Sequence, residues 1–274
     1  RNQAIQLSTL PHRENESMHQ STIETSISRR KLIGTAAAAG ISLGTIHWNR
    51  QEGLANELKN ELPNNGVVLF QGDSITDAGR NKNAKQANRI DALGRGYAML
   101  AASSLLANHP TLNLKCYNRG ISGNKVPDLD QRWQQDCIDL RPNVLSILIG
   151  VNDIWHKLNG NYKGTVKDYE TGLQALLERT RSALPETKIV ICEPFVLRCG
   201  AVSDNWFPEF DERREACRKV SDALQCTWVP FQQMFDEAVE NTEPAYWGGD
   251  GVHPSVAGHA LMAKTWLETV NASS

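Results

Sequence analysis

The chain has 274 residues with a formal net charge of -2, and 40% of its residues are hydrophobic, which is enough to fill a substantial core. The near-neutral balance of charge excludes the strongly basic surface of a nucleic-acid-binding protein. The sequence has no internal repeat, no heptad pattern and no long block of like charges, which excludes a repeat protein and a coiled coil.

The first part of the chain differs in composition from the rest. Residues 1–62 are rich in Ser, Thr, Asn and Gln and show no core-forming periodicity, so we expect a largely disordered N-terminal extension. Within it, Arg29 and Arg30 precede the uncharged apolar stretch 32–46. The basic and apolar segment 28–46 resembles a twin-arginine export signal and predicts a periplasmic or secreted protein. The alternatives are a membrane anchor and a chance basic pair before a helix. For an anchor, fifteen uncharged residues are short for a bilayer core of about 30 Å.

From residue 63 onward, strand-like and helix-like segments alternate. The strands are short apolar runs, predicted at 67–71, 112–117, 144–149, 188–192 and 227–230. The helices have apolar residues at helical spacing and are predicted near 95–108, 126–138, 165–183, 210–224 and after Pro254. Such alternation predicts one α/β domain over 63–274, a three-layer α/β/α sandwich around a five-stranded parallel sheet.

A serine follows the first of these strands at a turn. Gly72 opens the turn, and Ser74 occupies its first exposed position. Ligands bind at the carboxyl ends of parallel strands, so Ser74 is a candidate nucleophile. The alternative is an ordinary turn in which Ser74 is the N-cap of a short helix.

Other chemically useful residues follow the later strands. Gly120 follows the second strand and Asn152 the third, so parallel pairing places both near Ser74. Asp250 and His253 are three residues apart, just before the last helix, and a turn there would project both to one side.

Together these segments form four blocks. They are Gly72-Asp73-Ser74, Asn118 to Gly120, Gly150-Val151-Asn152-Asp153 and Asp250-Gly251-Val252-His253. In this order, the blocks resemble those of the SGNH (GDSL-like) hydrolase superfamily. The resemblance implies a flavodoxin-like fold and a serine esterase that works through an acyl-enzyme. Ile75 stands where the GDSL block has leucine, a replacement that alters no chemistry.

The four blocks supply the groups that ester hydrolysis needs. A serine hydroxyl is a weak nucleophile and requires an adjacent base, so His253 is expected to take the proton of Ser74 and pass it to the leaving alcohol. Asp250 is expected to hold the imidazole tautomer and stabilise the imidazolium. The oxyanion is expected to bind the backbone N–H groups of Ser74 and Gly120 and the side-chain amide of Asn152.

The substrate is less well defined by the sequence. Trp155 and Trp247 lie three residues from Asn152 and Asp250, where their rings could stack on a sugar; the alternative is that they belong to the core or to a lid. Because no long apolar lid is recognisable, we favour O-deacetylation of a carbohydrate, with a small-molecule or polysaccharide ester as substrate. A lysophospholipase or thioesterase is the enzymatic alternative, and a non-catalytic carbohydrate-binding protein on the same fold is the non-enzymatic one.

The remaining reactive residues carry no further motif. The six cysteines form neither a CxxC nor a zinc-ligand pattern, and their pairing stays open. His156 and His259 are expected to be structural or rim residues. No P-loop and no HExxH occurs, so neither a metal nor a cofactor is predicted. We expect no nucleic-acid partner, and contact with a membrane only during export.

Overall fold

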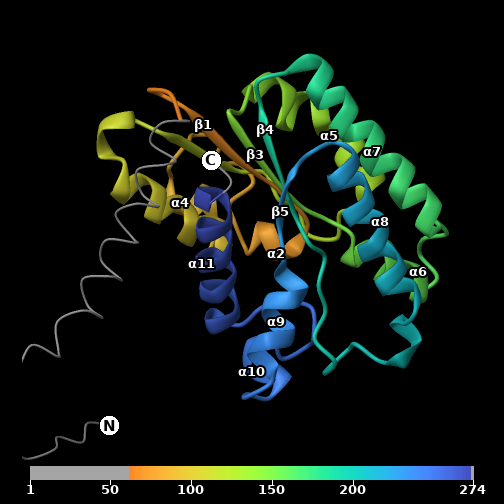
Figure 1. Ribbon diagram of the computed structural model, residues 1–274. Coiled ribbons are helices and arrows are strands. Elements are labelled where there is room, and N and C mark those ends of the chain that lie inside the picture. Colours follow the sequence, from red (N-terminus) through yellow and green to blue (C-terminus); the bar gives the residue numbers. More distant parts are fainter. Residues whose placement is uncertain (1–61, 273–274) are drawn as a thin grey trace, which may run out of the picture. The chain divides into compact units, whose positions relative to one another are not determined.

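The computed structural model describes residues 62–272, so the predicted export segment lies outside the described residues. Its centre is a sheet of five parallel strands in the order β2-β1-β3-β4-β5 (Figure 1). The strands are β1 (Val67–Gly72), β2 (Lys115–Asn118), β3 (Val144–Leu148), β4 (Lys188–Cys192) and β5 (Thr227–Val229). The predicted five-stranded parallel sheet is therefore confirmed.

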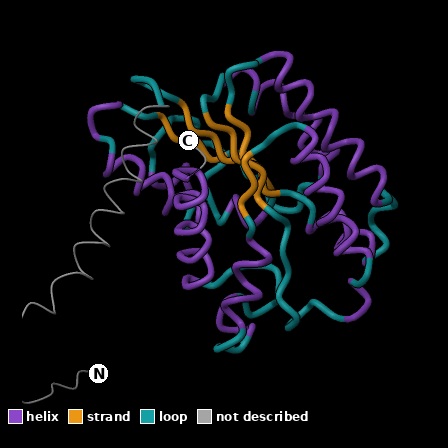
Figure 2. The backbone as a smooth tube through the Cα atoms, in the orientation of Figure 1, coloured by secondary structure: helices purple, strands orange, loops and turns teal. Residues whose placement is uncertain are grey.

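Helices cover both faces of this sheet (Figures 1 and 2). The helices of residues 62–272 with at least two turns are α4 (Tyr97–Asn108), α5 (Val126–Asp136), α6 (Val151–Leu158), α7 (Val166–Ala183), α8 (Glu209–Ala223), α9 (Phe231–Val239) and α11 (Val256–Ala272). Single turns form α2 (Ser74–Asp77), α3 (Ile90–Leu93) and α10 (Pro244–Trp247), with 3₁₀ turns η1 (Pro110–Leu112), η2 (Ile138–Leu140) and η3 (Asp204–Trp206). Within residues 62–272 no helix has both the length and the apolarity needed to cross a membrane.

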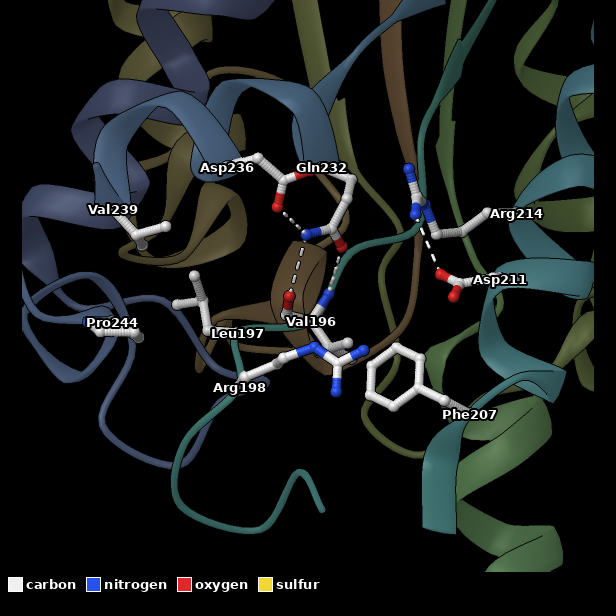
Figure 3. Close-up of a pocket in the computed structure, with 10 residues that line it drawn as sticks. All are labelled: Val196, Leu197, Arg198, Phe207, Asp211, Arg214, Gln232, Asp236, Val239 and Pro244. Atoms are coloured by element: carbon white, nitrogen blue, oxygen red, sulfur yellow. Dashed lines mark hydrogen bonds and ion pairs between the residues drawn. The ribbon is translucent and has the colours of Figure 1, made fainter. Parts of the chain in front are cut away.

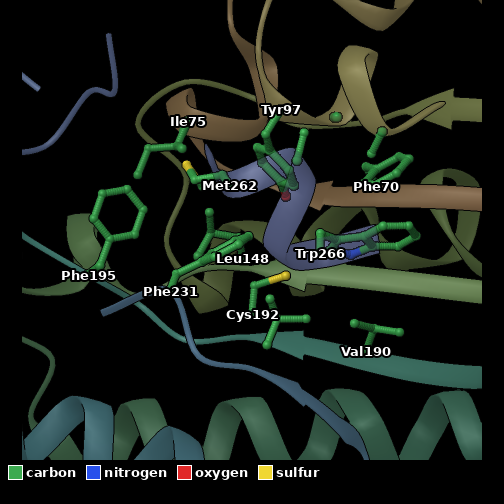
Figure 4. Packing of buried hydrophobic residues seen from close by; sticks show 14 of the residues in the cluster. Phe70, Ile75, Tyr97, Leu148, Val190, Cys192, Phe195, Phe231, Met262 and Trp266 are labelled. Atoms are coloured by element: carbon green, nitrogen blue, oxygen red, sulfur yellow. The ribbon is translucent and has the colours of Figure 1, made fainter. Parts of the chain in front are cut away.

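The sheet separates two hydrophobic cores because successive strand residues point to opposite faces. Val68 and Phe70 pack into the core beneath α4, α9 and α11, whereas Leu69 packs into the core beneath α5, α7 and α8. Figure 4 shows the first core, where the rings of Phe70 and Trp266 lie 5.1 Å apart. The indole N–H of Trp266 donates to Ser146 Oγ at 2.9 Å, which satisfies both buried polar groups.

The structure also differs from the predicted elements in places. Helices α6 and α9 were not predicted, because eight and nine residues give little room for a periodic pattern. The second strand begins at Lys115 rather than at residue 112, since the residues before it form η1. All six cysteines are unpaired; four are buried, and Cys199 and Cys226 are half-buried.

Candidate active site

Ser74, His253 and Asp250 form a continuous series of hydrogen bonds. Ser74 Oγ lies 2.9 Å from His253 Nε2, and His253 Nδ1 lies 2.6 Å from Asp250 Oδ2. The serine is 179 residues from the histidine in sequence, so the fold itself brings the two together. This is the arrangement in which an imidazole can accept a proton from the hydroxyl while the carboxylate holds its other nitrogen.

The turn that contains Asp250 and His253 is organised by the aspartate itself. Asp250 Oδ1 accepts the backbone N–H groups of Val252 and His253 at 2.9 and 2.7 Å, which leaves Oδ2 for the imidazole. Gly251 has φ of +83°, and a Cβ there would lie 2.6 Å from the carbonyl oxygen of Leu197, so only glycine fits. Burial would raise the pKa of Asp250, but the hydrogen bonds from His253 and Val252 outweigh it and lower that pKa.

Ser74 is the first residue of α2, directly after β1. Asp73, not Ser74, caps this helix, because its carboxylate accepts the N–H of Ile75 at 3.0 Å. The alternative in which Ser74 serves as the cap is therefore wrong, and its hydroxyl faces His253 instead. Within the described residues, the backbone N–H of Ser74 has no partner, so this donor is available to a ligand.

The loop after β2 requires a correction to the predicted oxyanion donors. The N–H of Gly120 donates to Asn118 Oδ1 at 2.8 Å, and Gly120 is buried, so the prediction that this N–H faces the substrate is wrong. The next two N–H groups are also occupied: Ile121 donates to Gly72 O, and Ser122 donates to Asp77 Oδ2. Gly123 follows with φ of +82°, and within the described residues its N–H has no partner.

Asp77 positions this loop from a distance of 45 residues in sequence. Its carboxylate accepts both the N–H and the hydroxyl of Ser122, at 3.0 and 2.8 Å, and lies 2.8 Å from Lys82 Nζ. Burial would raise the pKa of Asp77, but Lys82 and Ser122 together lower it. The Ser122 hydroxyl is thus occupied, as expected for a serine that is not the nucleophile. The sequence analysis missed Asp77, whose only signal was its position in the turn after β1.

Asn152 lies in the first turn of α6, directly after β3 and Gly150. It is 4% exposed, and its Nδ2 donates to the carbonyl oxygen of Asn124 at 3.2 Å. Asn124 directly follows Gly123, so the Asn152 amide contacts the loop that carries the unpaired N–H. A side-chain amide and a free backbone N–H, the kinds of donor that an anionic oxygen requires, thus belong to the same contact between α6 and this loop.

The two predicted aromatic residues differ in their surroundings. The ring of Trp155 is half-buried, with its centroid 6.0 Å from that of His253 and 5.7 Å from that of Trp206, which is almost fully buried. Trp247 is half-buried against the core and makes an edge contact with Tyr246 at 5.0 Å. Trp155 is thus the tryptophan that lies next to the triad.

A cavity of about 420 Å³ lies away from the triad, between the loop after β4, α8 and α9 (Figure 3). Its lining includes Arg198, whose guanidinium stacks on the Phe207 ring at 3.7 Å, and the ion pair of Asp211 with Arg214. Neither Ser74 nor His253 lines it.

The imidazole of His259 has a structural role, as expected. Its Nδ1 accepts the N–H of Tyr97 at 3.1 Å, and burial lowers the pKa of His259 to about 4.

The fold and the triad define an α/β serine hydrolase. Residues 70–261 match the GDSL-like lipase/acylhydrolase family, and the chain belongs to this family. It is thus an enzyme that hydrolyses ester bonds with a serine nucleophile.

Three relatives illustrate the similarity. A GDSL-like protein from Parabacteroides merdae is 51% identical, with a TM-score of 0.74 over 76% of this chain and 96% of the other. The structure of Axe2, an acetylxylan esterase from Geobacillus stearothermophilus, is 31% identical, with a TM-score of 0.69 over 77% and 96%. An acetylxylan esterase sequence from that organism is 33% identical over 207 residues, 74% of this chain and 93% of the relative.

The Axe2 structures include three catalytic mutants, in which a serine, an aspartate and a histidine are each replaced by alanine. The aspartate precedes the histidine by three residues there, as Asp250 precedes His253 here. The serine precedes the histidine by 179 residues in both chains.

Proposed function

We propose that this chain removes acetyl groups from acetylated xylan or xylooligosaccharides. The observation that carries the proposal is the hydrogen-bonded series from Ser74 through His253 to Asp250. The similarity to acetylxylan esterases then supports the choice of substrate class.

The reaction proceeds in two steps. His253 Nε2 takes the proton of Ser74 as Oγ attacks the acetyl carbonyl, and the same proton then protonates the departing sugar oxygen. The acetyl group remains esterified to Ser74. In the second step His253 removes a proton from water, which attacks this ester, releases acetate and restores the serine. Asp250 stays ionised throughout and stabilises the imidazolium.

The negative charge on the carbonyl oxygen needs donors that are already in place. We assign this role to the N–H groups of Ser74 and Gly123 and to Asn152 Nδ2, with Gly123 replacing Gly120 for the reason given above. The support is that both N–H groups are unpaired in the described part of the chain and that the Asn152 amide bonds Asn124, the residue after Gly123.

The carbohydrate part of the substrate is assigned to the aromatic residues. Trp155 is proposed to stack on a sugar face because its ring lies next to His253, with Trp206 behind it. Trp247 is proposed to support the same surface from α10. The lysophospholipase and thioesterase alternatives are not favoured by the relatives, and the complete triad disfavours a non-catalytic binding protein.

The test compares substrates and includes a matched variant. We expect the protein to release acetate from acetylated xylan and xylooligosaccharides, with much lower activity on octanoyl esters and lysophospholipid. Ser74→Ala should abolish turnover of all of them, whereas Ser122→Ala should keep it. A fluorophosphonate probe should label Ser74 only. Labelling of Ser122, or substantial activity in Ser74→Ala, would contradict the assignment.

We also propose that the segment 28–46, outside the described residues, directs export to the periplasm or the medium. The support is the pair Arg29 and Arg30 before an uncharged apolar stretch.

A further inference from the structure

Helix α6 carries more than the oxyanion donor. Trp155 and His156 follow Asn152 by three and four residues, so all three side chains lie on neighbouring parts of one helix face. Trp155 points toward His253, with ring centroids 6.0 Å apart. His156 lies toward the other side of the site, the side of the loop that contains Gly123.

The position of His156 is defined by its distance to that loop. A Cβ placed on Gly123 would have His156 Cε1 as its nearest neighbour, at 3.7 Å, with no other heavy atom within 4 Å. The imidazole therefore lies next to Gly123, the residue whose N–H is unpaired. Trp155 and His156 stand on the two sides of Asn152, one next to the base and one next to the oxyanion loop.

The imidazole of His156 is also chemically unengaged. The side chain is half-buried, and within residues 62–272 neither ring nitrogen has a hydrogen-bond partner. The nearby charges already pair with each other: Lys125 Nζ lies 2.6 Å from Asp128 Oδ2. Burial, and then the charge of Lys125, lowers the pKa of His156, so the ring is neutral at neutral pH. A neutral imidazole offers one donor and one acceptor, which matches a hydroxyl group.

We propose that His156 is a specificity-determining residue that hydrogen-bonds a free hydroxyl of the sugar unit carrying the acetyl group. The inference rests on the proposed function. It names the group of the substrate that the enzyme recognises, which is a hydroxyl next to the ester. Trp155 supplies a surface for the apolar face of the sugar, and His156 supplies the polar contact that sets its orientation. From the sequence we expected His156 to be a structural or rim residue; the proposal gives it a role in substrate recognition.

The first experiment measures kcat/KM for acetylated xylooligosaccharide and for p-nitrophenyl acetate, which has no sugar hydroxyl. For His156→Ala the ratio of the two values should fall about 5- to 30-fold, the effect of one lost hydrogen bond. His156→Gln, which keeps a donor and an acceptor, should recover part of the ratio, and His156→Phe should not. Leu158→Ala, on the exposed end of the same helix, should leave both activities unchanged.

The second experiment uses monoacetylated xylosides with and without the neighbouring hydroxyl. The His156→Ala effect should disappear with the deoxy substrate, because the contact is then missing in both enzymes. An equal loss with both sugars, or a ratio unchanged from the parent, would overturn the proposal for His156 alone. If the parent hydrolyses p-nitrophenyl acetate but no acetylated sugar, the proposed function fails and the inference fails with it.

Discussion

Asn118 accepts the backbone N–H of Gly120 with its side-chain oxygen at 2.8 Å. Its amide nitrogen donates to the carbonyl oxygens of Thr76 and Leu93, at 2.6 and 2.8 Å. One side chain, 1% exposed, thus ties the end of β2 to α2 and α3. The first of these bonds occupies the Gly120 N–H. Because the N–H groups of Ile121 and Ser122 also have partners, the free donor that follows them in this loop is the N–H of Gly123.

Replacing this side chain should destabilise the protein strongly. Asn118→Ala leaves a buried N–H and two buried carbonyls unpaired, so we expect a loss of about 3 kcal/mol or more in the free energy of unfolding. Urea denaturation measures it. Asn81→Ala is the control: that amide bonds the exposed Asp91, and its loss should cost about 0.5 kcal/mol. Equal losses for the two variants would show that the Asn118 network is not a stabilising element.

Gly120 and Gly123 show which part of the site could not be predicted from the sequence. The apolar run of β3 and the four blocks were enough to predict the parallel sheet and to select Ser74, Asp250 and His253. They could not distinguish Gly120 from Gly123, because the choice depends on which N–H groups are paired. Asn118, the partner of the Gly120 N–H, lies two residues earlier in the chain, and Asp77, the partner of the Ser122 N–H, lies 45 residues away.

Helix α6 could not be predicted from the sequence for a related reason. Its eight residues are too few for a periodic pattern, so neither the helix nor the shared face of Asn152, Trp155 and His156 was predicted. The predicted helix nearest to it began at residue 165, where Thr165 caps α7 by accepting the N–H of Asp168. Short helices of this kind are stabilised mainly by tertiary contacts, which the local sequence does not encode.

Loss of the Asn152 amide should lower turnover rather than affinity. Its hydrogen bond to the oxyanion strengthens as charge develops, so Asn152→Ala should reduce kcat about 10²–10³-fold with little change in KM. Steady-state kinetics on p-nitrophenyl acetate measures both values. Asn159→Ala, an exposed residue at the other end of α6, should behave like the parent. A change in KM alone would assign Asn152 to substrate binding.

Asp73 makes stability depend on pH near neutrality. Burial raises the pKa of its carboxyl from 3.8 to about 7. Between these values the folded protein keeps a proton that the unfolded chain has lost, so the Asp73 contribution to stability falls as pH rises from about 4 to about 7. Asp73→Asn keeps an oxygen for the Ile75 N–H and removes this titration.

The variant should therefore gain stability relative to the parent across this pH range, by up to about 4 kcal/mol. Urea midpoints at pH 4.5, 6 and 8 give the comparison. Asp91→Asn provides the control, because Arg89 lowers the pKa of Asp91 to about 2 and leaves it ionised throughout. A difference between Asp73→Asn and the parent that stays constant over these pH values would show that Asp73 titrates normally.

The export proposal has its own test. Arg29 and Arg30 are both replaced with lysine, which preserves charge but removes the guanidinium groups. We expect the variant to be as active as the parent but retained in the cytoplasm, as measured by esterase activity in separated cell fractions. Replacing Lys31 with arginine serves as the control. Normal export of the double variant would refute the signal.

Asp250 provides the sharpest test of the triad. In Asp250→Asn, the side-chain oxygen can still accept the N–H groups of Val252 and His253, so the turn should persist. The new amide then donates to His253 Nδ1, which forces the ring proton onto Nε2, the atom that must accept the proton of Ser74. We expect kcat to fall about 10²–10⁴-fold, less than in Ser74→Ala, with an unchanged circular dichroism spectrum. In the parent the hydrogen bonds from His253 and Val252 lower the pKa of Asp250 below its ordinary value of 3.8, so the stabilising effect of this carboxylate is fully present above that ordinary value and is lost as pH falls through the lowered pKa. Asp91→Asn should retain full activity. If Asp250→Asn instead stays within about fivefold of the parent, the carboxylate does not set the imidazole tautomer, and other contacts of His253, such as its packing against Trp155, would have to orient the ring.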